Sequence, residues 1–300
     1  MAMPPILGWR NVIEEPPVPV RKRDQMNYRH AFHAGNFADL QKHAILTALL
    51  SALTADARPL NVIDTHAGAG AYDLRGEMAQ KSREAEAGVG RLLAMDAPPA
   101  AFAALLKAVS DLNVTKDGSL YPGSPLLIAR GLRRTDRYTA CELRDDDFDS
   151  LRRVLAPYGF VQALKSDGYA AAVDRTGRAE RTFVLIDPPF ERADDYVQCV
   201  ATVRAVLARD PHAVVAIWTP LKDLETFDAF MRALEAVTDK ALAAELRLRP
   251  LRDPMKMNGC AMVVIGAPPS VEPVIAEITS WIAEHLGEPG GGARIWRTGG

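Results

Sequence analysis

Apolar runs and amphipathic stretches alternate along most of this chain. Leu40, Ile45, Leu49 and Leu53 form one apolar stripe, which predicts a helix over about 37–56. From residue 60 onward, short apolar runs predict strands, and segments with helical spacing separate several of them. We place seven strands near 60–64, 137–142, 160–165, 182–186, 213–218, 243–249 and 260–266, and helices near 145–156, 192–208 and 221–238. This alternation predicts an α/β fold with a mostly parallel sheet that helices cover on both faces.

Two spacings modify this pattern. Residues 65–136 separate the first two strands, which is far longer than a crossover connection requires. Within that stretch, residues 79–112 are rich in Ala and Leu, so we expect an inserted helical subdomain at about 75–120. Residues 250–259 leave no room for a helix between the last two strands, so these strands should form an antiparallel pair.

Both ends of the chain differ in composition from its centre. Residues 1–25 contain five prolines and no apolar periodicity, and Met26 after them is a candidate natural start. Residues 287–300 begin with a glycine-rich stretch. We therefore expect a flexible N-terminal extension over 1–25, one domain over 26–286 and a flexible tail over 287–300.

The composition narrows the class of protein. The chain is 48% hydrophobic and 25% charged, with no apolar run of 18 residues and no secretory signal pattern, so we expect a soluble cytoplasmic protein without a membrane partner. We also expect a monomer. The three cysteines lie far apart, and His30, His33, Asp39 and His43 lack the separations of a zinc site, so no metal is expected. A net charge of −2 implies that any contact with nucleic acid is local.

Acidic residues or a glycine-rich turn follow four of the predicted strands in succession. The first strand ends in Asp64-Thr65-His66-Ala67-Gly68-Ala69-Gly70, a turn that lets a ligand approach the backbone closely. Asp73 stands where a dinucleotide fingerprint requires a third glycine, which argues against a nicotinamide cofactor. Glu142 is placed to accept hydrogen bonds from ribose hydroxyls, and Asp167 to accept one from an adenine amino group. Together with Asp187 after the fourth strand, these features predict S-adenosylmethionine as the cofactor.

The fourth strand runs directly into Asp187-Pro188-Pro189-Phe190. Each proline fixes φ and lacks an N–H, so the carbonyls of Asp187 and Pro188 stay available as acceptors beside the carboxylate. With Phe190 as a stacking surface, these acceptors match an exocyclic amino group on a flat base. The pattern is typical of amino-methyltransferases and predicts Asp187 as the catalytic acceptor, with Pro188 and Phe190 contacting the base. The structural alternative is a strand followed by a proline-rich turn.

Five segments of the chain carry a family resemblance. They are Tyr28-Arg29-His30-x-Phe32-His33-Ala34-Gly35-Asn36-x-Ala38-Asp39-x-x-Lys42-His43, the glycine turn from Asp64 to Gly70, Tyr121-Pro122-Gly123-Ser124-Pro125, Asp167-Gly168, and Ile186-Asp187-Pro188-Pro189. Over about residues 26–268, the chain resembles the RlmJ-type 23S rRNA (adenine-N6)-methyltransferases. The resemblance implies a class I (Rossmann-like) methyltransferase fold, with a seven-stranded, mostly parallel sheet, an antiparallel last strand and a helical insertion after the first strand. It also implies S-adenosylmethionine-dependent methylation of N6 of a specific adenine in 23S rRNA.

The resemblance further implies roles for individual residues. His43, His66, Ser124, Glu142, Asp167, Gly168 and Asp187 match positions that line the cofactor site, and Asp187 also matches the catalytic acceptor. Tyr28 matches a position that contacts the RNA substrate. Phe190 stands where the family commonly has tyrosine, so stacking would survive without a hydroxyl group. Lys42 is either a solvated charge on its helix or a part of the site.

Two other functions stay open. An N6-adenine DNA methyltransferase would use the same platform, although such enzymes usually carry a separate target-recognition region. A non-catalytic RNA-binding assembly protein on the same fold would have no need to retain Asp187, Glu142 and the glycine turn. Arg130, Arg133, Arg134 and Arg137 form either an RNA-facing patch or a solvated helix end.

Overall fold

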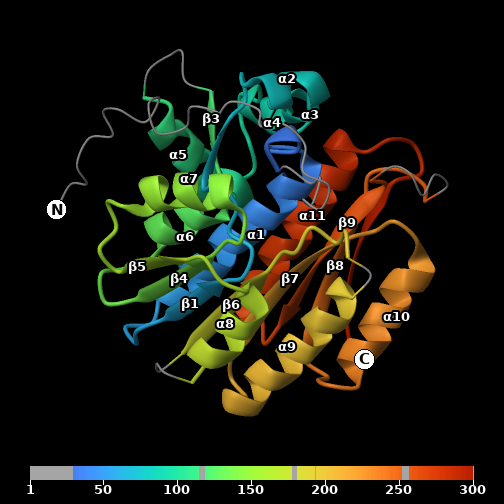
Figure 1. Cartoon of the computed structure of the whole chain (residues 1–300). Coiled ribbons are helices and arrows are strands. Elements are labelled where there is room, and N and C mark those ends of the chain that lie inside the picture. The colour runs from blue at the N-terminus through green and yellow to red at the C-terminus, as the bar shows by residue number, and fades with distance from the viewer. Residues whose placement is uncertain (1–29, 115–118, 178–180, 193, 252–256, 300) are drawn as a thin grey trace.

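An eight-stranded sheet with the strand order β10-β8-β9-β7-β6-β1-β4-β5 runs through the centre of the computed structural model (Figure 1). The structure describes residues 30–114, 119–177, 181–192, 194–251 and 257–299. The predicted extension over 1–25, the candidate start Met26 and the RNA-contacting position Tyr28 lie outside the described residues.

Five neighbouring strands of the sheet run parallel: β5 (Val161–Leu164), β4 (Arg137–Cys141), β1 (Asn61–Asp64), β6 (Thr182–Ile186) and β7 (Val214–Pro220). β9 (Gly259–Ile265) lies antiparallel between β7 and β8 (Ala241–Arg247). All seven predicted strands are present, and the antiparallel pairing predicted for the last two of them is confirmed. The predicted class I methyltransferase fold is therefore confirmed.

An eighth strand, β10 (Gly292–Arg297), extends the sheet where the sequence pattern predicts a flexible tail over 287–300. It pairs antiparallel with β8 along its whole length. The Trp296 indole donates to the buried carboxylate of Glu245 at 2.5 Å. The predictions of a seven-stranded sheet and of a flexible tail are wrong here, because the glycine-rich stretch only turns the chain toward the sheet edge. The segment has too few apolar residues to be recognised as a strand from its pattern.

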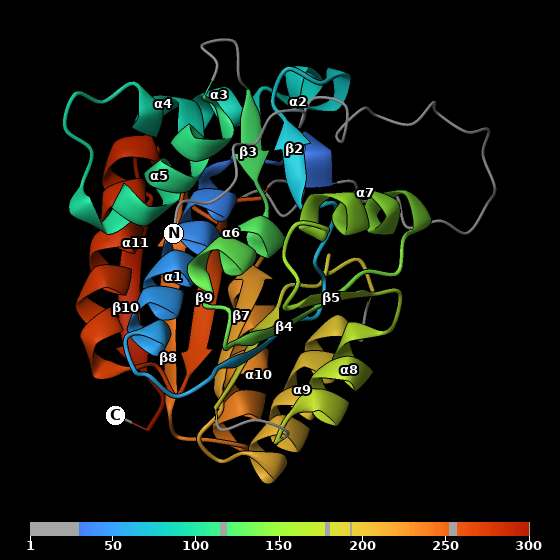
Figure 2. The same ribbon diagram turned by 90° about the vertical axis from the view of Figure 1, so that its left-hand side faces the viewer.

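Helices cover both faces of the sheet (Figure 2). On one face, α1 (Phe37–Thr54) packs against both α6 (Ser124–Gly131) and α11 (Glu272–Leu286), and α7 (Asp145–Leu155) contacts α6. On the other face lie α8 (Gly168–Arg175), α9 (Asp195–Arg209) and α10 (Leu224–Glu235). The helices predicted near 37–56, 145–156, 192–208 and 221–238 are confirmed as α1, α7, α9 and α10.

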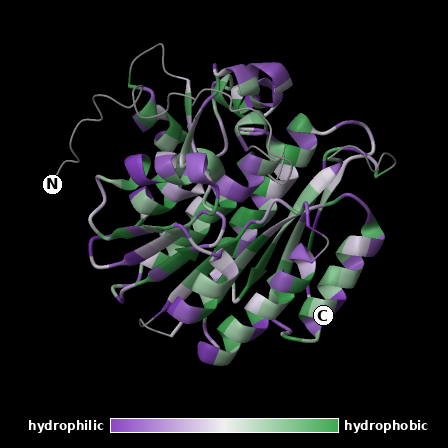
Figure 3. Ribbon diagram, viewed as in Figure 1, coloured by the Kyte–Doolittle hydropathy of each residue, from purple (hydrophilic) through white to green (hydrophobic). Residues whose placement is uncertain are grey.

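The alternation of side chains along β6 separates two layers of the core. Phe183 and Leu185 pack in the layer that includes α1 and α11, whereas Val184 and Ile186 pack in the layer that includes α9 and α10. The central strands are therefore mostly apolar, and green is their main colour in Figure 3. Burial of each such side chain contributes about 1.5–3 kcal/mol, so the two layers hold the strand ends in fixed positions.

The helical insertion follows β1. Its base is an antiparallel pair of β2 (Ala71–Asp73) and β3 (Leu120–Pro122), and between them it carries α2 (Glu77–Ser82), α3 (Glu84–Ala87), α4 (Val89–Leu93) and α5 (Ala103–Leu112). The insertion contacts the segment before α1, because Val89 N donates to the Gly35 carbonyl at 2.8 Å. A Cβ at Gly88 would lie 2.2 Å from the same carbonyl oxygen, so this contact requires glycine. Short 3₁₀ turns occur at His30–Phe32, Ala100–Phe102 and Pro269–Val271. Within the described ranges, we find no helix that combines the length and apolar character needed to cross a membrane.

Candidate active site

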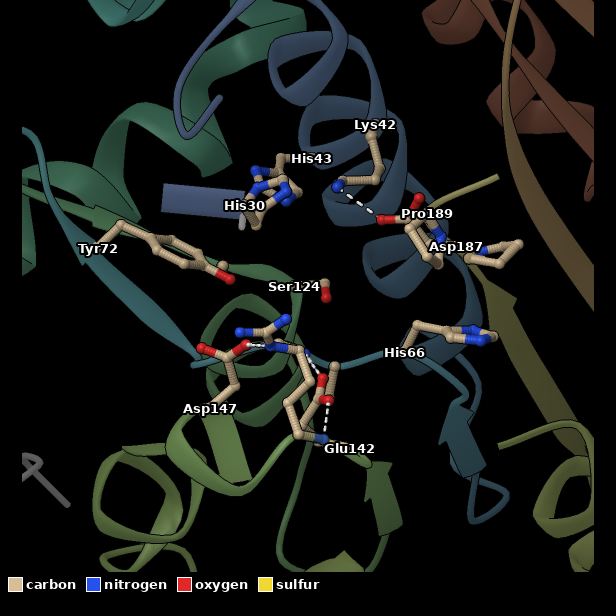
Figure 4. Close-up of a pocket in the computed structure, with 15 residues that line it drawn as sticks. His30, Lys42, His43, His66, Tyr72, Ser124, Glu142, Asp147, Asp187 and Pro189 are labelled. Atoms are coloured by element: carbon tan, nitrogen blue, oxygen red, sulfur yellow. Dashed lines mark hydrogen bonds and ion pairs between the residues drawn. The ribbon is translucent and has the colours of Figure 1, made fainter. Parts of the chain in front are cut away.

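A pocket opens at the carboxyl ends of β1, β4 and β6, the region where doubly wound sheets bind ligands (Figure 4). Six of the residues predicted to bind cofactor or substrate line it, namely His43, His66, Ser124, Glu142, Asp187 and Pro188. Ala67 and Gly68 of the glycine turn line it as well. Three of the four strand ends singled out in the sequence, those of β1, β4 and β6, therefore meet in one cavity.

Glu142 lies directly against the glycine turn. Its Oε2 accepts a hydrogen bond from Gly68 N at 2.9 Å, and its Oε1 accepts one from Arg144 N at 2.8 Å. Gly68 has a φ of +66°, and a Cβ there would lie 2.5 Å from the Tyr72 hydroxyl, so the turn requires glycine. Burial raises the pKa of Glu142. Each carboxylate oxygen keeps acceptor capacity for a hydroxyl group in the pocket.

Asp64, the last residue of β1, lies beneath the pocket and is fully buried. Its Oδ2 accepts hydrogen bonds from Ser124 Oγ at 2.8 Å and from Tyr138 Oη at 3.3 Å. Burial raises the pKa of Asp64 to about 7, and the charge of Asp187 acts in the same direction. Asp64 therefore orients Ser124, at the start of α6, from below.

Asp187 is held by a chain of charged side chains that starts on α1. Lys42 Nζ lies 2.7 Å from Asp187 Oδ2 (Figure 4), and the same atom lies 2.9 Å from Asp39 Oδ1. Asp39 Oδ2 in turn accepts from Gly35 N at 3.0 Å and lies 2.9 Å from His30 Nε2. Burial alone would raise the pKa of Asp39, but His30 and Lys42 outweigh burial and hold this pKa well below its usual range. Asp39 is therefore a buried anion, and its partner Lys42 also contacts Asp187, the predicted catalytic residue.

The two predicted cofactor histidines are neutral near pH 7. His43 Nδ1 lies 2.9 Å from the Tyr121 hydroxyl, and burial lowers the pKa of His43 to about 3. His66 Nδ1 lies 2.7 Å from Thr65 Oγ1, and burial lowers the pKa of His66 to about 4. Both rings therefore give the pocket polar but uncharged walls.

Asp167 and Gly168 lie at the end of β5 but are not among the residues that line the pocket. The Asp167 side chain caps α8 by accepting from Tyr169 N at 2.8 Å and Ala170 N at 3.3 Å. A Cβ at Gly168 would lie 1.9 Å from the Thr65 carbonyl, so glycine lets α8 approach the turn after β1. Their contribution to cofactor binding stays a prediction.

Phe190 departs from the expected geometry. Its φ is +51°, in the left-handed region that bulky residues rarely adopt. The ring is 5% exposed and packs against Tyr196, at a centroid distance of 4.7 Å, and Trp218, at 6.0 Å. The expectation that Phe190 presents an open stacking face is therefore wrong for this conformation, because the left-handed turn after the two prolines directs the ring into the core.

The arginine cluster of residues 130–137 does not reach the pocket. β4 begins at Arg137, so this residue lies at the amino ends of the parallel strands, whereas the pocket lies at their carboxyl ends. Arg133 donates to the carbonyls of Thr54 at 3.1 Å and Arg58 at 2.8 Å and pairs with Asp136 at 2.8 Å. Arg133 therefore ties α1 to the start of β4, and the interpretation of this cluster as part of the RNA-facing site is not supported.

Several pocket residues were not predicted from the sequence. Tyr72 comes from β2, its hydroxyl accepts from Ala69 N at 3.3 Å, and its ring centroid lies 4.9 Å from that of His30. Arg144 Nε donates to Asp147 Oδ2 at 3.0 Å across the mouth of the pocket. Arg144 and Asp147 closely follow the predicted strand end at residue 142, which is the signal that would have found them, whereas Tyr72 lies just beyond the glycine turn. In the described part of the chain, no group of three or more His, Cys, Asp or Glu side chains is arranged to hold a metal ion.

The chain is similar to several known proteins over most of its length. The sequence model of a family described as "Ribosomal RNA large subunit methyltransferase D, RlmJ" matches residues 57–298. The ribosomal RNA large subunit methyltransferase J of Escherichia coli is 31% identical over 269 residues, which cover 89% of this chain and 96% of that protein. The protein of the same name from Haemophilus influenzae is 33% identical over 271 residues, with 89% and 96% coverage. The crystal structure of the Legionella pneumophila protein LPL1258 superposes with a TM-score of 0.83 at 26% identity, over 89% of this chain and 99% of that one. This chain therefore belongs to the RlmJ family of ribosomal RNA large subunit methyltransferases.

Proposed function

We propose that this protein uses S-adenosylmethionine to methylate N6 of a specific adenine in 23S rRNA. The observation that carries the proposal is the end of β6, where Asp187 and Pro188 line the pocket of a chain that belongs to the RlmJ family. An adenine amino group offers two N–H donors, and the Asp187 carboxylate and the Pro188 carbonyl are matching acceptors. The names of the relatives support ribosomal RNA as the substrate class. In this proposal the protein acts in the cytoplasm as a monomer and without a metal ion.

The chemistry of the pocket lining suits S-adenosylmethionine. Gly68 places the backbone of the turn in the pocket wall, and Glu142 beside it has acceptor capacity for ribose hydroxyls. His43, His66 and Ser124 add neutral polar groups, and Asp167 and Gly168 complete the set that we propose holds the cofactor. When bound, S-adenosylmethionine supplies a methyl group on a positively charged sulfonium.

Asp187 and Pro188 are the groups that we propose make the adenine amine reactive. Its lone pair is delocalised into the ring, so an unassisted amine is a poor nucleophile. Accepting both N–H bonds frees the lone pair and stabilises the positive charge that develops on N6 in the transition state. Lys42 fixes the carboxylate before substrate arrives, so little reorganisation is needed. Complete removal of a proton before attack is not required. The N6–C bond would form as the S–CH₃ bond breaks, with S-adenosylhomocysteine as the leaving group, and the N6 proton would then pass to the Asp187 carboxylate and from there to water.

The purified protein, incubated with S-adenosylmethionine and transcribed 23S rRNA, provides the test. Mass-spectrometric mapping should find one N6-methyladenine in the RNA and none in DNA of the same sequence. Asp187→Asn keeps the shape of the side chain and should yield no product. The 23S rRNA of a deletion strain should lack the same modification. Methylation of the DNA alone would favour the DNA methyltransferase, and no methylation of either would favour a binding protein.

A further inference from the structure

A second hollow of about 620 Å³ lies beside the candidate active site. Three parts of the chain form its walls. The first is the start of α1 at Phe37 together with His33 before it, and the second is the insertion with Arg91 of α4. The third is formed by Arg249, which follows β8, and Met257, which precedes β9. Figure 2 shows α3 and α4 of the insertion above α11, and Arg91 Nη1 donates to the His285 carbonyl near the end of α11 at 3.4 Å. We name this hollow the insertion groove.

The insertion groove lies next to the active site, because both share lining residues with a smaller hollow. A smaller hollow between them is lined by Lys42 and Asp187 at one end and by His33, Asn36 and Met257 at the other. The first two residues also line the candidate active site, and the last three also line the insertion groove. These shared residues mark the shortest route from Asp187 past Met257 to the groove.

The carboxylates in the insertion groove already have partners. Glu84 lies 3.0 Å from His33 Nδ1 and accepts from Asn36 Nδ2 at 2.8 Å, while Glu288 pairs with Arg249 at 2.7 Å. The Glu84 hydrogen bond raises the pKa of His33 and so favours the protonated form of this ring. Arg91 donates to the His285 carbonyl and, among the described residues, has no carboxylate within ion-pair distance.

We propose that the insertion groove holds the nucleotide next to the target adenine, with its phosphate at Arg91 and its base against Phe37 and Met257. This inference rests on the proposed function. An adenine can reach the pocket only when it leaves its helical stack, so its neighbour along the chain is exposed as well. Cationic side chains that follow the backbone, together with aromatic surfaces for the bases, are what single-stranded nucleic acid requires. The volume is also within the range of ordinary ligand sites.

Charge reversal at Arg91 tests the proposal. Arg91 is exposed, so Arg91→Glu should leave the fold intact. The matched control is Arg134→Glu, an equal charge change at an exposed position just before β4, at the amino ends of the parallel strands. We measure binding of transcribed 23S rRNA in the presence of S-adenosylhomocysteine, and S-adenosylhomocysteine affinity by calorimetry. Arg91→Glu should weaken RNA binding by at least about tenfold and Arg134→Glu by less than about twofold, with cofactor affinity unchanged in both. Arg91→Lys, which keeps the charge, should bind RNA almost as the wild type does.

The results separate this inference from the proposed function. Equal RNA binding by Arg91→Glu and Arg134→Glu would overturn the proposal that the insertion groove holds RNA, even if the wild-type protein methylates 23S rRNA. If the wild-type protein transfers no methyl group while Arg91→Glu still weakens RNA binding selectively, the groove stands and the proposed reaction fails. A loss of cofactor affinity in Arg91→Glu equal to its loss of RNA affinity would also count against the groove.

Discussion

Lys42 Nζ lies 2.7 Å from Asp187 Oδ2 and so joins two residues that are 145 positions apart in the sequence. The Lys42 side chain is 6% exposed and that of Asp187 is 15% exposed. Water therefore cannot easily replace either partner, and the pair fixes the carboxylate at the end of β6. The same ammonium group contacts Asp39, so α1 controls the position of the catalytic candidate.

Replacing Lys42 with methionine should lower kcat far more than it changes KM for RNA. Methionine keeps most of the side-chain length but removes the cation between Asp39 and Asp187. We expect a loss of at least about a hundredfold in kcat and a destabilisation of about 3–5 kcal/mol, because buried carboxylates lose their partner. Steady-state kinetics well below the unfolding midpoint separate the two effects. A kcat close to that of the wild type would mean that other contacts position Asp187.

Asp187→Ala should remove turnover while leaving most of the cofactor affinity. The carboxylate acts on charge that develops in the transition state, so we expect kcat to fall by at least about 10²–10³-fold. S-adenosylhomocysteine affinity, measured by calorimetry, should change only a few-fold. Methylation near the wild-type rate would falsify the assignment of Asp187.

The carboxyl-end residues were predictable because a parallel sheet brings its strand ends together. Glu142 and Asp187 directly follow apolar runs, and the topology alone places them at one edge. The role of Lys42 was harder to predict. Helical spacing puts Asp39, Lys42 and His43 on one side of α1, but which strand end this side faces depends on long-range packing.

Phe190 and β10 are two further features that the sequence pattern predicted incorrectly. The motif around Asp187 specifies an aromatic residue, but the left-handed φ of Phe190 decides where its ring points. For β10, pairing with β8 supplies the strand, whereas its own sequence carries little apolar alternation. In both cases tertiary contacts outweigh local preference.

Stability should respond to pH through Asp64. Its folded pKa of about 7 lies above the ordinary value of 3.8, so its stabilising contribution is present below that ordinary value and is lost as pH rises through 7. Asp64→Asn removes this titration. Its unfolding free energy relative to wild type should therefore rise by roughly 2–3 kcal/mol between pH 5 and pH 8. Urea denaturation at several pH values measures this difference, and a constant difference would mean that Asp64 is already ionised at pH 5.

Tyr72→Phe should weaken cofactor binding while leaving the ring contact with His30 in place. The hydroxyl accepts from Ala69 N in the glycine turn, so its loss frees the turn that faces the cofactor. One such hydrogen bond contributes about 0.5–1.5 kcal/mol, or roughly 2- to 13-fold in affinity. Calorimetry with S-adenosylhomocysteine measures the change. Tyr158→Phe, at a tyrosine outside the pocket, is the control and should bind like the wild type.

Truncation of the N-terminus should show that methylation requires the residues just before α1 but not residues 1–25. A chain that begins at Met26 should be as stable and as active on 23S rRNA as the full chain. A chain that begins at Asn36 loses His30 and Gly35, both bonded to Asp39, and should lose methylation. The sheet should survive, because Asn36 itself accepts from Ala38 N and Asp39 N and still caps α1. Methylation rates at fixed salt and thermal melts of both chains provide the measurement. If removing residues 1–25 already reduces activity by more than roughly tenfold, Arg21, Lys22 and Arg23 belong to an RNA-binding arm and the boundary at residue 26 is wrong.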